Sequence, residues 1–309
     1  MRATAAAHAN IALVKYWGKK DDALHLPEAG SLSVALDKLL TTTTVELGDF
    51  ASDSLTLDGR AEDPRRVRAF LDAAGIAPRA RIVSRNEFPT AAGLASSASG
   101  FAALAVAACA AAGLRKSPEE LSALARLGSG SATRSVPGGW AVWEGESARQ
   151  VYAPAHWDLR FCVAVCAGGA KDVGSRDGMR ATRETSPYHR SWIEQCKRDL
   201  PEALRFLGER DLLGLGGLAE RNALRMHADA LAAVPPLVYW QAPTVACLHA
   251  LRELRASGVG AWPTIDAGPH VVAMCLRQDA PAVEARLRGI DGIAEVLVCA
   301  PAGGARVLP

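Results

Sequence analysis

The segment Asn86–Gly100 constrains this chain more than any other, because tiny residues and hydroxyls gather directly before an apolar stretch. Its glycines and alanines let the backbone turn tightly and approach a ligand closely. Three serines stand where the helix predicted over 101–112 begins, so their hydroxyls can cap its free N–H groups or turn toward an anion. The helix dipole favours a phosphate-rich ligand there, such as a nucleotide. A buried alanine-rich helix with a serine cap is the alternative, and neither GxGxxG nor GxxxxGK[ST] is present.

The composition excludes several classes of protein. With 309 residues, 49% apolar and 22% charged, the chain is long enough for two domains or one large one. It has 35 basic and 33 acidic side chains, and the net charge of +2 gives no reason to expect a nucleic-acid partner. The N-terminus lacks a continuous apolar run, and the apolar stretch 101–114 is too short to span a bilayer. We therefore expect a cytoplasmic protein without a membrane partner.

The seven cysteines predict reduced thiols rather than a disulfide framework, because their number is odd and most lie inside apolar runs. Only Cys162 and Cys166 are close in sequence, and no further His or Cys stands near them at zinc-ligand spacing. No metal site is expected at this pair.

Hydrophobic periodicity predicts an α+β fold rather than a strict alternation of strands and helices. A connector at 154–158 separates two halves, and we place the domains at 1–160 and 161–309 with the ligand bound between them. The predicted strands cover 11–16, 32–36, 41–47, 54–57, 81–85, 140–144, 161–167, 271–276 and 294–299, and the predicted helices cover 64–74, 101–112, 118–127, 187–207, 212–233, 244–257 and 280–287.

Further polar groups interrupt stretches that ought to be buried or tightly turned. Lys15 ends an apolar strand, where its ammonium needs an anionic partner unless its stem packs and its amine reaches water. Ser129–Arg134 combines hydroxyls with an arginine suited to a phosphate or carboxylate, and Asp266 precedes a Gly-Pro turn. Each of these, like Thr182–Pro187, also has an ordinary explanation as a loop, turn or cap. Together they describe a polyphosphate site that makes or breaks a bond at a hydroxyl.

Five segments, collinear along nearly the whole chain, resemble the motifs of mevalonate diphosphate decarboxylases, a branch of the GHMP kinase superfamily. The first resembles the N-terminal signature of that family and the second its phosphate loop. Chance similarity is a poor explanation for five motifs in one order. The segments are Ala9–Lys19, Phe88–Gly100, Gly128–Ser135, Gly178-Met179 with Thr185-Ser186-Pro187, and Asp266–Pro269.

The resemblance implies a two-domain GHMP-kinase fold, with a ribosomal protein S5 domain 2-like N-terminal domain, an α/β C-terminal domain and the active site in the cleft between them. It implies decarboxylation of mevalonate 5-diphosphate to isopentenyl diphosphate, with ATP as co-substrate and ADP, phosphate and CO2 as co-products. The C3 hydroxyl is phosphorylated first, and loss of that phosphate drives out CO2. Mg²⁺ is expected mainly on the ATP phosphates. A homodimer is expected from the family alone.

Carried over by position, the resemblance assigns Asp266 to the C3 hydroxyl, as base or as orienting group, beside Lys15. Arg134 matches the arginine that holds the substrate carboxylate, and Ser97 the serine that orients the phosphates. An aspartate between a lysine and an arginine should stay ionised, so we favour orientation as much as proton removal. The implied substrate contacts are Tyr16, Trp17, Gly18, Lys19, Arg66 (with Arg65 as the alternative), Ser129, Gly130, Ser131, Ala132, Thr133, Thr185 and Ser186, and the implied ATP contacts are Pro89, Ala91, Gly93, Leu94, Ala95, Ser96, Ser97 and Ser99.

The chain departs from the family pattern at three places. His270 replaces the usual asparagine, Ala29-Gly30-Ser31 replaces Asn-Ser-Ser, and Thr133 replaces cysteine. These departures do not change Lys15, Arg134 or Asp266. They bear mainly on whether the substrate carries a 5-phosphate or a 5-diphosphate. A decarboxylase of mevalonate 5-phosphate, a kinase that stops at the 3-phosphate and a non-catalytic metabolite binder are the alternatives. The complete set of lysine, arginine and aspartate favours a decarboxylase, because kinase-only relatives tend to lose parts of it.

Overall fold

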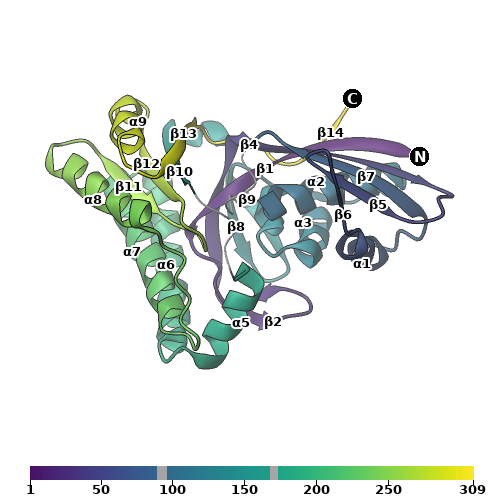
Figure 1. The fold of residues 1–309 in the computed structure, drawn as a ribbon, viewed down its shortest axis with the longest axis horizontal. Coiled ribbons are helices and arrows are strands. Elements are labelled where there is room, and N and C mark those ends of the chain that lie inside the picture. The colour runs from purple at the N-terminus through teal and green to yellow at the C-terminus, as the bar shows by residue number, and fades with distance from the viewer. Residues whose placement is uncertain (89–95, 168–172) are drawn as a thin grey trace.

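The computed structural model describes residues 1–88, 96–167 and 173–309, which form two sheets with helices packed on them (Figure 1). The first sheet is built on two long antiparallel strands, β1 (Arg2–Val14) and β4 (Ser31–Gly48). Among the described residues its order is β14-β1-β4-β7-β5-β6, and β8 and β9 form a hairpin that pairs on β4. The other strands of this sheet are β5 (Ser54–Leu57), β6 (Arg60–Glu62), β7 (Arg79–Asn86), β8 (Trp140–Glu144), β9 (Ser147–Tyr152) and β14 (Arg306–Leu308).

Helix α2 (Ser96–Ala111) packs on β1 and β4 and is buried along almost its whole length. This burial explains its composition, since a helix without a polar face is stable only when other elements surround it. Alanines also let it approach the sheet closely. Helices α1 (Arg65–Ala73), α3 (Pro118–Gly128) and the short α4 (Ala132–Ser135) complete this layer, and the hydroxyl of Ser117 caps the N-terminus of α3.

The second sheet has the order β11-β12-β10-β13, with strands β10 (Leu159–Cys166), β11 (Ala261–Thr264), β12 (Val271–Leu276) and β13 (Ile293–Cys299). Its strands are antiparallel and mostly buried. In Figure 1 the helices of this half stand at the side opposite α1 and β5. The helices are α5 (Ser175–Thr185), α6 (His189–Glu209), α7 (Leu212–Leu231), α8 (Ala242–Ala256) and α9 (Ala280–Arg288), and a single 3-10 turn covers Pro154–His156.

The two halves share one hydrophobic core. Leu13 of β1, Leu36 of β4, Phe161 of β10 and Leu215 of α7 belong to the same buried cluster. Strand β14, at the far end of the sequence, pairs with β1, so the last part of the chain returns to the first sheet. A small hairpin of β2 (Lys19–Asp21) and β3 (Leu26–Pro27) lies beside α5 where the halves meet (Figure 1).

Most of the predicted elements are confirmed, but several boundaries are wrong. The strands expected over 32–36 and 41–47 are one strand, β4, which continues through a bulge at the exposed Asp37 and Lys38. β1 begins nine residues before the expected start, at Arg2, because the alanines before Ile11 are buried strand residues. Helix α5 and strand β14 were not predicted. No helix in the described part of the chain is both long enough and apolar enough to cross a membrane.

Candidate active site between the two halves

A cavity of about 470 Å³ opens where β1, the β2–β3 hairpin, the N-terminus of α2 and α5 come together. Twelve of the residues predicted from the sequence line it, although they come from distant parts of the chain. The structure therefore assembles most of the predicted site in one place. These residues are Lys15, Tyr16, Trp17, Lys19, Arg66, Ser96, Ser97, Ser129, Gly130, Ser131, Arg134 and Asp266.

Lys15 and Asp266 form an ion pair at the base of this cavity. The Lys15 Nζ lies 2.5 Å from Asp266 Oδ1 and donates a second hydrogen bond of 2.8 Å to the Ala12 carbonyl. The lysine side chain is 2% exposed and the aspartate 38%. Burial lowers the pKa of Lys15, and the charge of Asp266 opposes that shift. The alternative in which the amine of Lys15 reaches bulk water is wrong.

A buried network behind the cavity fixes the backbone of Lys15. The N–H of Lys15 donates to Asn222 Oδ1 of α7 at 2.8 Å, and Asn222 Nδ2 donates to Asp199 Oδ2 of α6 at 2.8 Å. Thr264, two residues before Asp266, donates to the Ala12 carbonyl at 3.1 Å. Both members of the ion pair are thereby tied to the same strand end. The sequence did not point to Asn222, because an asparagine within a helix has no local signature for a contact this distant.

Arg134 lies in α4 with its side chain buried and 3% exposed. Its Nε donates to Asn10 Oδ1 at 3.2 Å, and one terminal nitrogen donates to Ser31 Oγ at 2.6 Å. Burial lowers the pKa of Arg134 to about 10, against the charge of Asp266, so it stays protonated at neutral pH. Both partners are neutral oxygens, which leaves the arginine's positive charge available to an anion in the cavity. The solvated-loop alternative for this segment is wrong.

Hydroxyl groups from two loops meet at the N-terminus of α2. Ser97 Oγ lies 3.3 Å from Ser129 Oγ, which lies 3.2 Å from Ser131 Oγ. Gly130 between these serines packs directly on Tyr16, since a Cβ there would lie 2.6 Å from the ring atom Cε1. The exposed Ser97, at a helix N-terminus, is placed to contact an anion.

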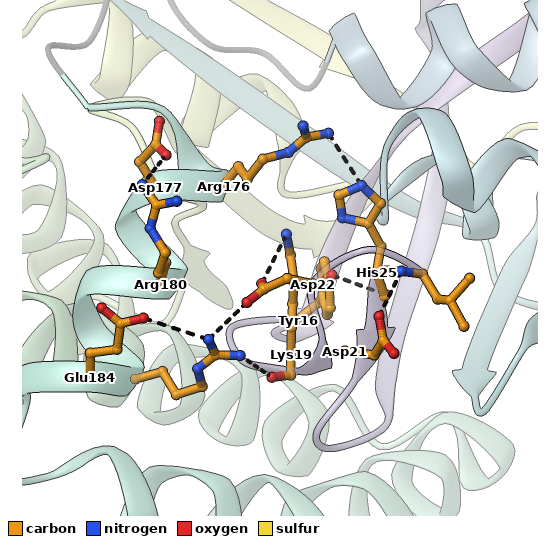
Figure 2. A network of polar contacts seen from close by, with 11 residues as sticks. Tyr16, Lys19, Asp21, Asp22, His25, Arg176, Asp177, Arg180 and Glu184 are labelled. Atoms are coloured by element: carbon orange, nitrogen blue, oxygen red, sulfur yellow. Dashed lines mark hydrogen bonds and ion pairs between the residues drawn. The ribbon is translucent and has the colours of Figure 1, made fainter. Parts of the chain in front are cut away.

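The opposite end of the cavity is lined by cations from the hairpin and α5 (Figure 2). Figure 2 shows Arg176 and His25 pointing toward one another, and Arg176 NH2 lies 3.2 Å from His25 Nε2. Burial, with the charge of Arg176 as the next cause, lowers the pKa of Lys19 to about 8. Burial and the neighbouring Lys19, Arg176 and Arg66 lower the pKa of His25 to about 4. Lys19, Arg66 and Arg176 thus bring like charges close together, which suits a multiply charged anion.

Sequence reasoning missed Arg176, His25, Ser175 and Asn10 in this lining. The structure places other predicted residues outside it. Gly18, Ala132 and Thr133 adjoin lining residues in the sequence, and Ser99 is buried with its hydroxyl 2.6 Å from that of Thr41. Thr185 and Ser186 lie at the C-terminal end of α5, where Thr185 Oγ1 donates to the Ala181 carbonyl at 2.6 Å and accepts from the Val234 N–H at 2.8 Å. The predicted ATP contacts Pro89, Ala91, Gly93, Leu94 and Ala95 lie outside the described residues.

A second cavity of about 310 Å³ adjoins the first and shares Arg66, Ser96 and Ser97 with it. Its walls include the apolar side chains of Leu55, Leu57, Ile82, Phe101 and Leu104. A polar cavity that continues into an apolar one suits a ligand with phosphates at one end and a flat base at the other.

No group of three or more His, Cys, Asp or Glu side chains is close enough to hold a metal ion, within the parts of the chain described here. The oxygen donors of the lining include the hydroxyls of the serines and the carboxylate of Asp266. Such hard oxygens suit Mg²⁺ shared with nucleotide phosphates.

Comparison with known proteins shows matches over both halves. Residues 7–153 match the family model of the diphosphomevalonate decarboxylase-like N-terminal domain, and residues 161–294 match that of the mevalonate 5-diphosphate decarboxylase C-terminal domain. The human diphosphomevalonate decarboxylase is 37% identical over 308 residues, with 88% of this chain and 76% of that protein covered. The enzyme of Aspergillus fumigatus is 36% identical over 330 residues, with 94% and 81% covered.

Solved structures agree with these sequence matches. A mevalonate diphosphate decarboxylase from Staphylococcus aureus superposes with a TM-score of 0.94 at 36% identity, covering 100% of this chain and 98% of that one. The enzyme from Enterococcus faecalis gives 0.93 at 36% identity, with 100% and 99% covered. A structure described as a complex with MVAPP, AMPPCP and magnesium gives 0.94 at 37% identity, again with 100% and 99% covered. The predicted two-domain α+β fold of the GHMP-kinase type is confirmed.

Proposed function

The chain belongs to the diphosphomevalonate decarboxylase family, and on that premise we propose that it converts (R)-5-diphosphomevalonate and ATP into isopentenyl diphosphate, ADP, phosphate and CO2. This would place it in the mevalonate pathway of isoprenoid biosynthesis. The observation that carries the proposal is the meeting of Lys15, Arg134 and Asp266 at one end of a cavity whose other end is cationic.

The charges of the cavity suggest one orientation for the substrate. Lys19, Arg66 and Arg176 form the end that suits the 5-diphosphate. Arg134 offers an enclosed guanidinium to the carboxylate at the other end of the substrate. The C3 hydroxyl then lies near Asp266. In this arrangement the diphosphate and the carboxylate of the substrate each lie beside positively charged side chains.

The chemistry proceeds in two stages. The γ-phosphoryl group passes to the C3 oxygen, and Asp266 orients the hydroxyl or takes up its proton. The C3–O bond then breaks with loss of phosphate, and the electrons of the C1–C2 bond form the C2–C3 double bond as CO2 leaves. Lys15, 2.5 Å from Asp266, stabilises the negative charge that develops on the transferred phosphate. Arg134 keeps the carboxylate in line and in a site with little water.

ATP is proposed to place its base in the apolar cavity lined by Leu55, Ile82 and Phe101 and its phosphates at the α2 N-terminus. Ser96, Ser97 and their neighbouring hydroxyls would contact the phosphates and the Mg²⁺ they carry. When bound, Mg²⁺ neutralises phosphate charge during the transfer. The relative whose structure holds AMPPCP and magnesium supports ATP as the co-substrate and Mg²⁺ as its metal. A homodimer, expected from the family, and a cytoplasmic location, expected from the sequence, stay predictions.

The alternatives are a decarboxylase of mevalonate 5-phosphate and a mevalonate 3-kinase. The cationic end includes Lys19, Arg66 and Arg176, with Arg183 held nearby by Asp22, and that much positive charge favours the diphosphate. The intact Lys15–Asp266 pair and Arg134 favour decarboxylation over phosphorylation alone. Neither alternative has an observation of its own in its favour.

The test is to incubate the protein with ATP and Mg²⁺ and, separately, mevalonate, its 5-phosphate and its 5-diphosphate. CO2 and ADP are measured together. Equal amounts of both, with the diphosphate alone, are the expected result. The same result with the monophosphate would move the function to the other decarboxylase. ADP without CO2 would make the protein a kinase and overturn the proposal.

A further inference from the structure

Three ionisable side chains meet outside the cavity lining, between the helices α6 and α7 and the segment 17–28, which we call the substrate hairpin. His189 Nδ1 lies 2.8 Å from Asp229 Oδ2, and His189 Nε2 lies 3.3 Å from Glu28 Oε2. The side chains of His189 and Asp229 are 7% and 1% exposed, and that of Glu28 is 33% exposed. We call these three residues the His189 ion cluster. The proposed reaction uses none of them.

The geometry requires a proton on both nitrogens of His189. Carboxylate oxygens accept hydrogen bonds, whereas a neutral imidazole has only one N–H to donate. The imidazolium ion satisfies both contacts. Burial by itself would lower the pKa of His189, but the hydrogen bonds and charges of Asp229 and Glu28 outweigh burial and raise it above its ordinary value. These two carboxylates, one from α7 and one from the hairpin, are the charged groups that face the ring.

The cluster is joined to the backbone of the substrate hairpin. The N–H of Glu28 donates to the Gly18 carbonyl at 3.2 Å, which ties the outgoing limb of the hairpin to the incoming limb. Gly18 packs on the cluster, since a Cβ there would lie 3.1 Å from Glu28 Oε2 and 3.3 Å from His189 Cε1. One turn along α6 from His189, Trp192 Nε1 donates to the Trp17 carbonyl at 2.7 Å. Helix α6 therefore holds both limbs.

The same hairpin carries side chains of the candidate site. Trp17, Lys19 and His25 line the cavity, and the ammonium of Lys19 lies at its cationic end. On the far side, Arg183 of α5 donates to the Lys19 carbonyl and to Asp22, each at 2.8 Å. The hairpin is thus held between α5 and α6. Its position relative to the cavity depends on both attachments.

We propose that His189 is a positioning residue for the reaction, because its ion cluster holds the substrate hairpin where Trp17 and Lys19 meet the phosphate end of the substrate. The proposal rests on the proposed function only for the identity of that substrate. The contact is electrostatic, and no bond is made or broken at His189. A loosened hairpin weakens binding in the ground state and the transition state alike, so it raises KM and leaves kcat largely unchanged.

The first test replaces Glu28 by glutamine, which removes one charge and keeps the size and the backbone hydrogen bond to Gly18. We expect the KM for 5-diphosphomevalonate to rise about fivefold at pH 6.5, because one partly exposed charge-assisted hydrogen bond is lost. The kcat should stay within about twofold of the value of the unaltered protein. Glu194→Gln is the matched control, because Glu194 makes an exposed pair with Arg190 on the same helix. It should behave as the unaltered protein.

The pH dependence separates positioning from a merely structural role. Below the raised pKa, His189 carries its charge and Glu28→Gln loses an ion pair. Above it, the imidazole is neutral in both proteins, so the ratio of the KM values of Glu28→Gln and the unaltered protein falls to about 1. A KM ratio that stays the same from pH 6 up to the highest pH at which both proteins remain folded would overturn the proposal.

Hydrogen exchange gives a readout that does not depend on catalysis. The amides of 17–28, including that of Glu28, should exchange faster in Glu28→Gln and in the double variant His189→Gln/Asp229→Asn, which removes the cluster without leaving a buried carboxylate unpaired. Unchanged exchange in both variants would overturn the proposal. If the unaltered protein releases no CO2 from any phosphorylated mevalonate, the proposed function fails, while the exchange experiment still decides the role of His189.

Discussion

The ammonium of Lys15 lies 2.5 Å from the carboxylate of Asp266, although 251 positions separate the two residues in the sequence. The lysine is buried and has no other carboxylate among its described partners, so the charge of Asp266 is what opposes the effect of burial on the pKa of Lys15. Removing the aspartate's charge leaves a buried cation that has lost its counter-ion, which makes this pair the natural first target for mutation.

Replacing Asp266 by asparagine should lower kcat by at least about 100-fold, because the group that orients the C3 hydroxyl or takes its proton is lost. Binding of 5-diphosphomevalonate, measured by calorimetry, should change far less, since the cationic end of the cavity is untouched. Asp291→Asn, at an exposed aspartate before β13, is the control. Near-normal turnover of Asp266→Asn would contradict the role proposed for this residue.

Replacing Asn222 by alanine should reduce the free energy of unfolding by about 1–3 kcal/mol, because the buried N–H of Lys15 and the carboxylate of Asp199 each lose a partner. Urea unfolding followed by fluorescence measures this change. The kcat should fall as well, since the strand end that carries Lys15 is no longer fixed. Gln278→Ala, at an exposed position, should leave both quantities unchanged.

The affinity for the substrate should weaken at alkaline pH. The pKa of Lys19 in the free protein is about 8, below its ordinary value, so the ammonium charge is lost as the pH rises through that value. The kcat/KM for 5-diphosphomevalonate should therefore fall above pH 8. In Lys19→Arg the guanidinium stays charged, and this alkaline decrease should move to higher pH. A pH profile of kcat/KM that is the same in both proteins would show that Lys19 does not contact the diphosphate.

Replacing Gly130 by alanine should lower kcat/KM by about tenfold or more, through displacement of Tyr16. The added Cβ would lie 2.6 Å from Cε1 and 2.7 Å from the hydroxyl of that partly buried ring, closer than any real contact. Gly303→Ala is the control, because nothing lies within 4 Å of a Cβ at that position. Equal kcat/KM values for the two variants would mean that the position of Tyr16 does not matter to the site.

The sequence predicts well those parts of the fold that local patterns determine. Ser117 and Pro118 mark the start of α3, and the Asp58-Gly59 turn marks the hairpin of β5 and β6. The collinear motifs predict a common site for Lys15, Arg134 and Asp266, and all three line the same cavity. Each of these turns, caps and motifs is made by residues that lie close together in the sequence.

Other features depend on contacts between distant elements and left no local signal. Arg176 lies in α5, whose sequence reads as polar and irregular, and its place in the cavity follows from how α5 packs beside the hairpin. His189 and Asp229 look like ordinary helix residues until α6 and α7 bring them to 2.8 Å. The exposed Asp37 and Lys38 suggest a break within β4, yet the neighbouring strands keep it continuous.

The pairing of β14 with β1 has a consequence for folding during synthesis. Thr4 faces Leu308, so the ribosome makes β1 long before the strand that covers this edge of the sheet. Until β14 pairs with it, this edge of β1 has unpaired backbone N–H and C=O groups to which another chain can bind. A nascent chain that stops after β9 would contain most of the first sheet, but the edge of β1 would be uncovered. We expect such chains to need chaperones or to aggregate.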